Sequence, residues 1–265
     1  MPELPEVETV RRDLARIVVG KQVVAIRGSA AKRLRRIRGL RFDGLRRRGK
    51  YLLGLLGELE LIIHLGMSGR LLAAPEVPIT PHVRLVIELD DGALLIFVDR
   101  RRFGRVSVVR RGDYRSSPTL MNMGPEPLSS HFNRRAFERY LAGAKAPIKA
   151  VLLSQRAVAG IGNIYADEVL HRAGIHPARR QTNSDEAGRL YRAIRAVLAA
   201  AVRHRGTSFS LHRDGLLPPG AFGRYLRVFQ RAGAPCHSCG GPIAKVRLAG
   251  RSTYFCPTCQ APSDG

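Results

Sequence analysis

The chain has 265 residues, of which 45% are hydrophobic, so it can bury a core in one or two domains and is not a disordered tail. Lys and Arg number 45 against 21 Asp and Glu, and the formal charge of +24 favours a polyanionic partner, most commonly nucleic acid. A membrane surface is the alternative, but we find no long uncharged apolar run and no signal-peptide pattern, so we expect a cytoplasmic protein without a membrane partner.

The first predicted element is a helix over residues 5–20. Pro5 suits an early helical position, Glu6 and Glu8 complement the positive first turn, and Gly20 suits the end. The residues before this helix read MPEL, and a small residue after an initiator methionine usually allows that methionine to be removed. We therefore expect the processed chain to begin with the secondary amine of a proline.

Strand-like segments follow the first helix. Asp91-Gly92 separates two β-rich halves of one of them and predicts a hairpin. This succession predicts an N-terminal β-sandwich or barrel. The segments cover residues 22–28, 50–56, 59–66, 83–99 and 104–110.

The pattern changes at MNMGPEPLSS, whose glycine and prolines mark a linker. Helices are predicted beyond it, and Asn163 suits an N-cap. The last and longest helix carries an apolar face that repeats every four residues from Leu190 to Val202. The predicted helices cover residues 131–143, 146–155, 162–174 and 184–206.

These patterns predict an α+β protein of two domains. The N-terminal β domain covers residues 1–122 and a linker covers 123–130. A helical domain covers 131–230, and a cysteine-containing hairpin covers 231–265.

All four cysteines lie in the C-terminal segment, with two residues between the members of each pair and sixteen between the pairs. This spacing is typical of a zinc site with four thiolate ligands, around a hairpin centred on Gly250. Two disulfides are disfavoured in a reducing cytosol, and four thiolates leave no open position for a catalytic water. We therefore predict one structural Zn²⁺, bound by Cys236, Cys239, Cys256 and Cys259.

Four segments in order, MPELPEVE, HLGMSG, GIGNIYADE and GRSTYFCPTC, resemble the bacterial formamidopyrimidine-DNA glycosylases. The similarity extends over nearly the whole chain. It implies a β-sandwich domain and a helical domain with a helix–two-turn–helix motif and a zinc finger. It also implies a monomeric base-excision repair enzyme that removes oxidised purines such as 8-oxoguanine from duplex DNA and cleaves the strand by β,δ-elimination.

The resemblance implies four catalytic residues. In the family the terminal proline amine, here Pro2, attacks C1′ of the damaged nucleotide, and Glu3 moves protons at the base or the sugar. Glu6 matches a second acidic position, and ordering of the helix start is an alternative role for it. Lys50 matches a lysine near the lesion.

The resemblance also implies three residues that fill the gap left by an extruded base: Met67, Arg101 and Phe103. Alone, Met67 and Phe103 would fit a core, but neighbouring turn formers favour loop tips. Arg100 stands where the family usually has a proline, which removes a stiff turn and adds a charge.

Phosphate contacts are implied for His82, Lys149, Asn163 and Arg251. The alternatives are an ordinary strand-edge histidine, a solvated lysine and, for Asn163, a plain N-cap. Glu168 matches a structural position. Residues 206–222 match a loop that covers the lesion.

Two other functions remain possible from the sequence alone. One is an endonuclease VIII-like glycosylase for oxidised pyrimidines, although those enzymes usually start Pro-Glu-Gly-Pro-Glu and this chain has Leu4. The other is a non-catalytic zinc-ribbon protein that binds nucleic acid with steep salt dependence but does not cleave it.

Overall fold

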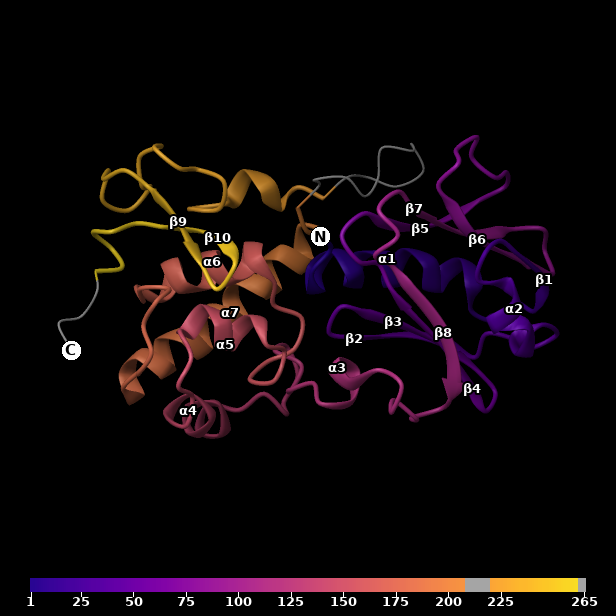
Figure 1. Ribbon diagram of the computed structural model, residues 1–265, viewed down its shortest axis with the longest axis horizontal. Coiled ribbons are helices and arrows are strands. Elements are labelled where there is room, and N and C mark those ends of the chain that lie inside the picture. Colours follow the sequence, from indigo (N-terminus) through magenta and orange to yellow (C-terminus); the bar gives the residue numbers. More distant parts are fainter. Residues whose placement is uncertain (208–219, 262–265) are drawn as a thin grey trace. The chain divides into compact units, whose positions relative to one another are not determined.

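The computed structural model describes residues 1–207 and 220–261, which form two compact units (Figure 1). The first unit comprises residues 1–121. The second comprises residues 122–207 together with the described residues from 220 onward. The zinc hairpin falls in the same unit as the helices, and the finer division of this unit into two domains stays a prediction.

The first unit is built on two four-stranded antiparallel sheets, with strand orders β1-β6-β7-β5 and β2-β3-β4-β8. Apolar side chains from the inner faces of both sheets form one core, so the predicted sandwich is confirmed. The first sheet consists of β1 (Val23–Arg27), β5 (Gly69–Ala74), β6 (Val83–Leu89) and β7 (Leu94–Asp99). The second consists of β2 (Gly44–Arg48), β3 (Tyr51–Leu56), β4 (Leu59–His64) and β8 (Arg105–Arg110).

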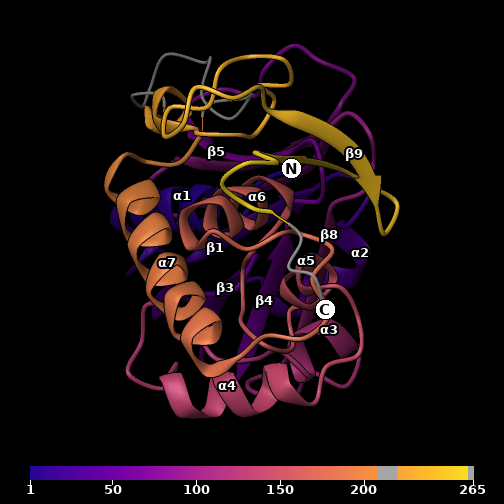
Figure 2. The same cartoon turned by 90° about the vertical axis from the view of Figure 1, so that its left-hand side faces the viewer.

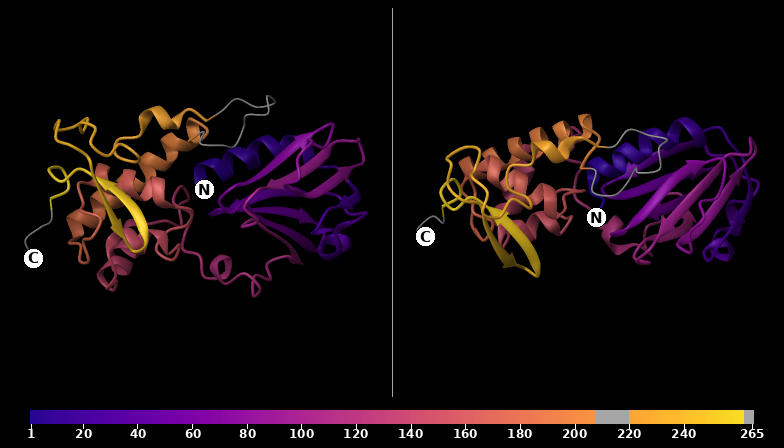
Figure 3. Two further views of the ribbon diagram at one scale, coloured as in Figure 1. Left: turned by 45° about the horizontal axis from the view of Figure 1, so that its top comes forward. Right: turned by 90° about the horizontal axis from the view of Figure 1, so that it is seen from above.

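Helices cover the two open sides of this sandwich (Figure 3). On one side α1 (Leu4–Val18) contacts β2 and β5, which are the edge strands of the two sheets. On the other side α2 (Ala31–Leu34) contacts the opposite edge strands, β8 and β1, and continues into η1 (Arg35–Ile37). Each sheet therefore has both of its edges protected. A short helix, α3 (Pro118–Met121), ends the unit.

Helix α1 has one apolar face and one charged anchor. Val7, Val10 and Leu14 are buried in the shared core at helical spacing. On another face Glu8 accepts hydrogen bonds from Arg11 and Arg12, and its Oε2 lies 3.1 Å from Nε of Arg47 on β2. Burial acts to raise the pKa of Glu8, but these guanidinium groups more than offset it and lower the pKa to about 2.

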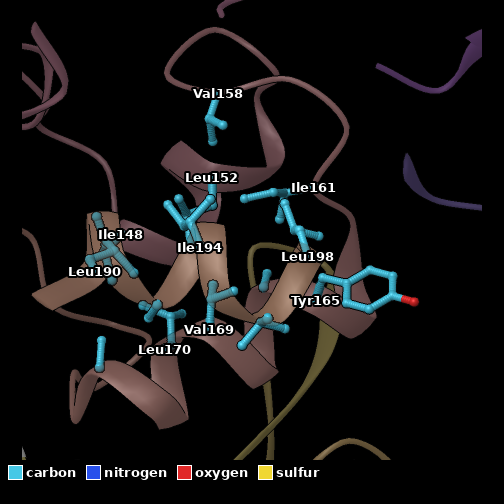
Figure 4. Close-up of a cluster of buried hydrophobic side chains, with 14 of the residues drawn as sticks. Ile148, Leu152, Val158, Ile161, Tyr165, Val169, Leu170, Leu190, Ile194 and Leu198 are labelled. Carbon is cyan, nitrogen blue, oxygen red and sulfur yellow. The ribbon is translucent and has the colours of Figure 1, made fainter. Parts of the chain in front are cut away.

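The second unit packs its helices around a separate core (Figure 2). Apolar residues of α5, α6 and α7 converge there, as Figure 4 shows, and the predicted face of α7 from Leu190 to Leu198 is buried. The helices are α4 (Arg134–Ala142), α5 (Ile148–Leu153), α6 (Asn163–Ala173), α7 (Ser184–Arg203) and η2 (Phe222–Tyr225). The hairpin is formed by β9 (Ala244–Leu248) and β10 (Arg251–Phe255).

Residues 154–162 connect α5 to α6 in the helix–two-turn–helix motif, and a buried glutamine organises this connection. Gln155 Nε2 donates to the Ile161 carbonyl at 2.6 Å, and its Oε1 accepts the Gly160 N–H at 2.8 Å. The Gln155 carbonyl in turn accepts the Gly124 N–H at 2.8 Å, which fastens the start of the unit to the same turn.

The structure differs from the sequence prediction at several element boundaries. Strands β2 and β5 were not predicted, because GLRRR and GRLLAA lack the alternation of polar and apolar residues on which the prediction relied. Helix α1 ends at Val18 instead of Gly20, and α7 ends at Arg203. Among the described residues, no helix is both long and apolar enough to cross a membrane.

The Glu8 anchor predicts an acid-dependent contribution to stability. Glu8→Gln should lower the free energy of unfolding by about 1–2 kcal/mol at neutral pH, because charge-assisted hydrogen bonds to three arginines are weakened. Since the folded-state pKa is lowered, the difference should be complete above the ordinary value of 4.5 and should close as pH falls toward about 2. Urea unfolding across this range would test it, with Glu58→Gln as the exposed control; a pH-independent difference would contradict it.

Candidate active site and nucleic-acid interface

The N-terminus lies directly before α1, and its acidic residues are buried. Glu3 is the N-cap residue, and its backbone N–H donates to Glu6 Oε2 at 2.9 Å as part of a capping box. Pro2 is buried, whereas Met1 is 45% exposed. The structure thus gives Glu6 the role of ordering the helix start, which places the Pro2 nitrogen at the positive end of the helix.

Lys50 occupies the tight turn between β2 and β3. Arg48 and Tyr51 are paired across the hairpin, so Gly49 and Lys50 form a two-residue loop. Gly49 has φ +54°, as the first loop position of a type II′ turn requires. Lys50 is only 8% exposed, so its ammonium is held by the fold and is not an ordinary surface charge.

His64 stands beside Lys50 and was missed by the sequence analysis. It is paired with Tyr51 across β3 and β4, and the two rings lie 4.7 Å apart. Burial, followed by the positive charges of Lys50 and Arg105, lowers the pKa of His64 to about 4. Its Nδ1 accepts the Gly66 N–H at 3.2 Å, so the neutral ring carries its proton on Nε2 and remains a donor. Its position in HLGMSG, three residues before Met67, was the available signal.

The three predicted gap-filling residues lie on two loops of the first unit. Met67, between β4 and β5, is 40% exposed, and Phe103, between β7 and β8, is 51% exposed. The Arg101 guanidinium lies 4.9 Å from the centroid of the Phe103 ring. The side chains are therefore at loop tips and not in the core. Arg100, which replaces the usual proline, is exposed on the second of these loops.

His82 is half-buried just before β6, where its carbonyl accepts the Asp99 N–H at 2.9 Å. This bond joins His82 to the end of β7, next to the second of these loops. This contact is made by the His82 backbone, so the phosphate contact expected of the imidazole stays a prediction.

Asn163 is the first residue of α6, and Gly162 is the N-cap residue, so the prediction that Asn163 caps the helix was wrong. The reason is that the extended conformation an N-cap needs is adopted by Gly162, one position earlier. The Asn163 amide instead donates to the Ser252 carbonyl at 2.9 Å and links α6 to the zinc hairpin. Its contact with a phosphate stays a prediction.

Lys149 is 1% exposed and its ammonium is used inside the protein. Its Nζ lies 2.7 Å from Asp167 Oδ1 and donates to Thr253 Oγ1 at 2.8 Å. Asp167 Oδ2 accepts the Tyr254 N–H at 3.0 Å. Burial raises the pKa of the Asp167 carboxyl, and the Lys149 ammonium opposes that rise. Lys149 is therefore not a solvated lysine, and a phosphate contact would require this ion pair to open.

Glu168, the next residue of α6, has the structural role that was expected. Its two carboxylate oxygens accept the N–H groups of three consecutive residues at 2.9–3.0 Å. These are Arg227, Val228 and Phe229. Asn163, Asp167 and Glu168 thus all bond α6 to the segment that carries the zinc site.

The four cysteines form a site of the right size for zinc. Their sulfur atoms lie within 4.8 Å of one another, with Cys239 and Cys256 3.4 Å apart and Cys236 and Cys259 3.9 Å apart. Zn–S bonds of about 2.3 Å in a tetrahedron require sulfur atoms about 3.8 Å apart. The thiols are free, not paired as disulfides, which fits one structural Zn²⁺. His171 Nε2, on α6, lies 3.5 Å from Cys236 Sγ and is placed to orient that ligand.

Arg251 is presented at the tip of the zinc hairpin. It pairs with Leu248, and the two loop residues between them, Ala249 and Gly250, have φ values of +49° and +73°. Positive φ at both positions is typical of a type I′ turn, which is unfavourable for alanine. Arg251 is exposed, so its guanidinium is accessible from solvent, and its contact with a phosphate stays a prediction.

The loop expected over residues 206–222 lies largely outside the described residues, which resume at Gly220. Its two ends are joined by a bridge between Thr207 and Ala221.

Three family models match consecutive parts of the chain. Residues 1–106 match the formamidopyrimidine-DNA glycosylase N-terminal domain, and residues 123–212 match the H2TH domain of the same enzymes. Residues 233–262 match a zinc finger found in FPG and IleRS.

Similar proteins extend over the full length. A Deinococcus radiodurans formamidopyrimidine-DNA glycosylase is 48% identical over 98% of this chain and 97% of its own length. The crystal structure of the Thermus thermophilus MutM (Fpg) protein has a TM-score of 0.91 and 46% identity, covering 99% of this chain and all of that one. A Lactococcus lactis FPG mutant in complex with Fapy-dG-containing DNA has a TM-score of 0.91 and 35% identity, covering 98% of this chain and all of that one.

The buried ion pair between Lys149 on α5 and Asp167 on α6 predicts strong non-additivity. Lys149→Met or Asp167→Asn alone should lower the free energy of opening of this region by about 3–5 kcal/mol, because each leaves one buried group without its ionic partner. The double variant with Lys149→Met and Asp167→Asn should lower the free energy of opening of this region by much less than the sum of the two single effects. The local free energy of opening at the Tyr254 amide, measured by hydrogen exchange, would report this coupling. Additive effects would show that the two charges do not depend on each other.

Proposed function

The chain belongs to the formamidopyrimidine-DNA glycosylase family, and we propose that it excises oxidised purines from duplex DNA and then cleaves the strand as an AP lyase. The observation that carries this proposal is the N-terminus, where a proline precedes a helix capped by Glu3 and Glu6. Formamidopyrimidines and 8-oxoguanine are the substrates we expect, with one chain per duplex.

The first chemical step needs a neutral amine. Removal of the exposed Met1 frees the Pro2 nitrogen, and the positive end of α1 favours the unprotonated form. The nitrogen attacks C1′ of the damaged nucleotide, and the bond from C1′ to the base breaks. Glu3 is the group that we assign to proton transfer at the departing base or the sugar ring oxygen.

Strand cleavage follows from the product of that step. Opening of the sugar ring leaves an iminium between the Pro2 nitrogen and C1′, and a secondary amine makes this iminium necessarily cationic. The cation accepts electrons as a proton leaves C2′, and the 3′ phosphate departs. A second proton loss expels the 5′ phosphate, leaving a one-nucleotide gap, and hydrolysis of the iminium returns the amine.

Extrusion of the base has to be compensated by other contacts. Unstacking costs a few kcal/mol, and the exposed apolar tips of Met67 and Phe103 are suited to fill the space. Arg101, on the same loop as Phe103, has donors for the base left opposite.

Each unit, taken by itself, presents groups suited to contact a DNA phosphate. In the first, Lys50 supplies a charge and neutral His64 supplies an N–H donor next to it. In the second, Asn163 and Arg251 lie at the helix–hairpin junction and the hairpin tip. Of these, Arg251 is the most accessible, and we expect its removal to weaken binding to all sequences alike.

Glu3→Gln tests the assignment while keeping the helix cap, because the glutamine side-chain oxygen can still accept the backbone N–H. We expect excision of 8-oxoguanine opposite cytosine to fall about 10²- to 10⁴-fold. Cleavage at a preformed abasic site should fall much less, since no base needs to leave. Glu88→Gln, a surface carboxylate of β6, is the matched control.

The same assay distinguishes the proposed function from the two alternatives, a glycosylase for oxidised pyrimidines and a non-catalytic nucleic-acid-binding protein. Single-turnover excision would be followed on duplexes with 8-oxoguanine or thymine glycol. Preference for thymine glycol would indicate the pyrimidine enzyme, and binding without cleavage of either would indicate the non-catalytic protein. Full activity of Glu3→Gln on 8-oxoguanine would remove Glu3 from the chemistry.

A further inference from the structure

Asp99, the last residue of β7, lies between the two loops that carry the gap-filling residues. We call these the insertion loops: residues 65–68, between β4 and β5, and residues 100–104, between β7 and β8. Asp99 is 1% exposed, so its carboxylate is removed from water and has to be satisfied by the protein.

The carboxylate accepts hydrogen bonds from both insertion loops. From the first, Ser68 Oγ donates to Oδ1 at 2.6 Å. From the second, the Arg101 N–H donates to Oδ1 at 3.2 Å and the Gly104 N–H donates to Oδ2 at 2.7 Å. Ser68 Oγ also accepts the Arg101 N–H at 3.1 Å, so the loops are bonded to each other as well as to Asp99.

The backbones of the two loops are packed too closely to move independently. Gly66 has φ +64°, and a Cβ there would lie 2.6 Å from the Phe103 carbonyl carbon. A Cβ on Gly104 would lie 2.3 Å from the Phe97 ring and 3.0 Å from Asp99 Oδ2. Gly66 therefore allows the two loops to meet, and Gly104 leaves room beside that contact for the Phe97 ring and the Asp99 carboxylate.

We propose that Asp99 is a positioning residue that couples the insertion loops, so that Met67, Arg101 and Phe103 enter the duplex as one rigid group. The inference rests on the proposed function, because it concerns how the lesion-bearing duplex is held open. Only a carboxylate suits the position, since all its partners are donors and an ionised carboxylate is acceptor-only. An amide would turn one N–H₂ group toward those donors and leave one of them unsatisfied.

Coupling has a consequence for specificity. Arg101 can test the base opposite the lesion only if its backbone is fixed while Met67 holds the stack apart. If the loops were uncoupled, Met67 and Arg101 would move independently. Discrimination between opposite bases would then fall, even though both side chains are intact.

The variant to measure is Asp99→Asn, compared with Asp43→Asn. Asp43 is an exposed carboxylate of the same unit whose Oδ2 accepts the Gly57 N–H at 2.7 Å, so it controls for loss of a carboxylate acceptor at a β-turn. Excision of 8-oxoguanine opposite cytosine and opposite adenine would be measured for both variants and for Arg101→Ala. Cleavage of an abasic-site duplex would be measured in parallel.

We expect Asp99→Asn to lower kcat/KM on 8-oxoguanine opposite cytosine by about 10- to 100-fold, because misplacement by about 1 Å can cost this much. The ratio between cytosine and adenine should collapse to that of Arg101→Ala, and the double variant should be no worse than the more affected single variant. Abasic-site cleavage should change by less than about threefold, since no base pair must be opened.

Equal losses on 8-oxoguanine and abasic substrates, or an unchanged opposite-base ratio, would overturn the coupling and leave Asp99 a purely structural residue. Should Asp99→Asn fail to fold, Ser68→Ala removes the side chain that joins the loops and should shift the ratio in the same direction. An inactive wild-type protein would refute the proposed function. A 2-aminopurine probe beside the lesion would then still show whether Asp99→Asn slows duplex opening.

Discussion

Hydrogen bonds from backbone N–H groups to buried carboxylates fix several of the segments that carry the proposed DNA-contacting residues. One such bond orders the start of α1 next to the Pro2 amine, and others join the insertion loops and fix the zinc segment on α6. Each of these carboxylates is at most 3% exposed and would be costly to bury without its donors. The four are Glu6, Asp99, Asp167 and Glu168.

This arrangement suits the charge of the protein. With 45 basic and 21 acidic residues, the chain attracts DNA through its net positive charge, and binding of this kind carries no information about the lesion. Specificity needs a few groups held in fixed positions. Buried acids supply that rigidity without placing negative charge against the DNA backbone, and exposed arginines such as Arg251 and Arg101 remain available for contact.

Much of the fold was predictable because its signals are local. The cysteine spacing identified the zinc site, Asp91-Gly92 identified a hairpin, and the apolar repeat of α7 identified its buried face. The features that were missed depend on distant partners. Nothing near Lys149 in the sequence indicates that its ammonium is neutralised by Asp167 and bonded to Thr253, and nothing near Asp99 indicates that Ser68 shares its carboxylate. His64 was overlooked because a histidine at a strand end is common, and the burial and the neighbouring charges of Lys50 and Arg105 that lower its pKa appear only in the fold.

Every step of the proposed chemistry depends on the Pro2 amine. The direct test is to incubate the purified protein with a duplex containing 8-oxoguanine opposite cytosine, reduce with borohydride, digest, and identify the cross-linked peptide by mass spectrometry. We expect one adduct, on the peptide that begins at Pro2 after loss of Met1. Cross-linking at a lysine such as Lys50, or no adduct from a chain confirmed to begin at Pro2, would contradict it.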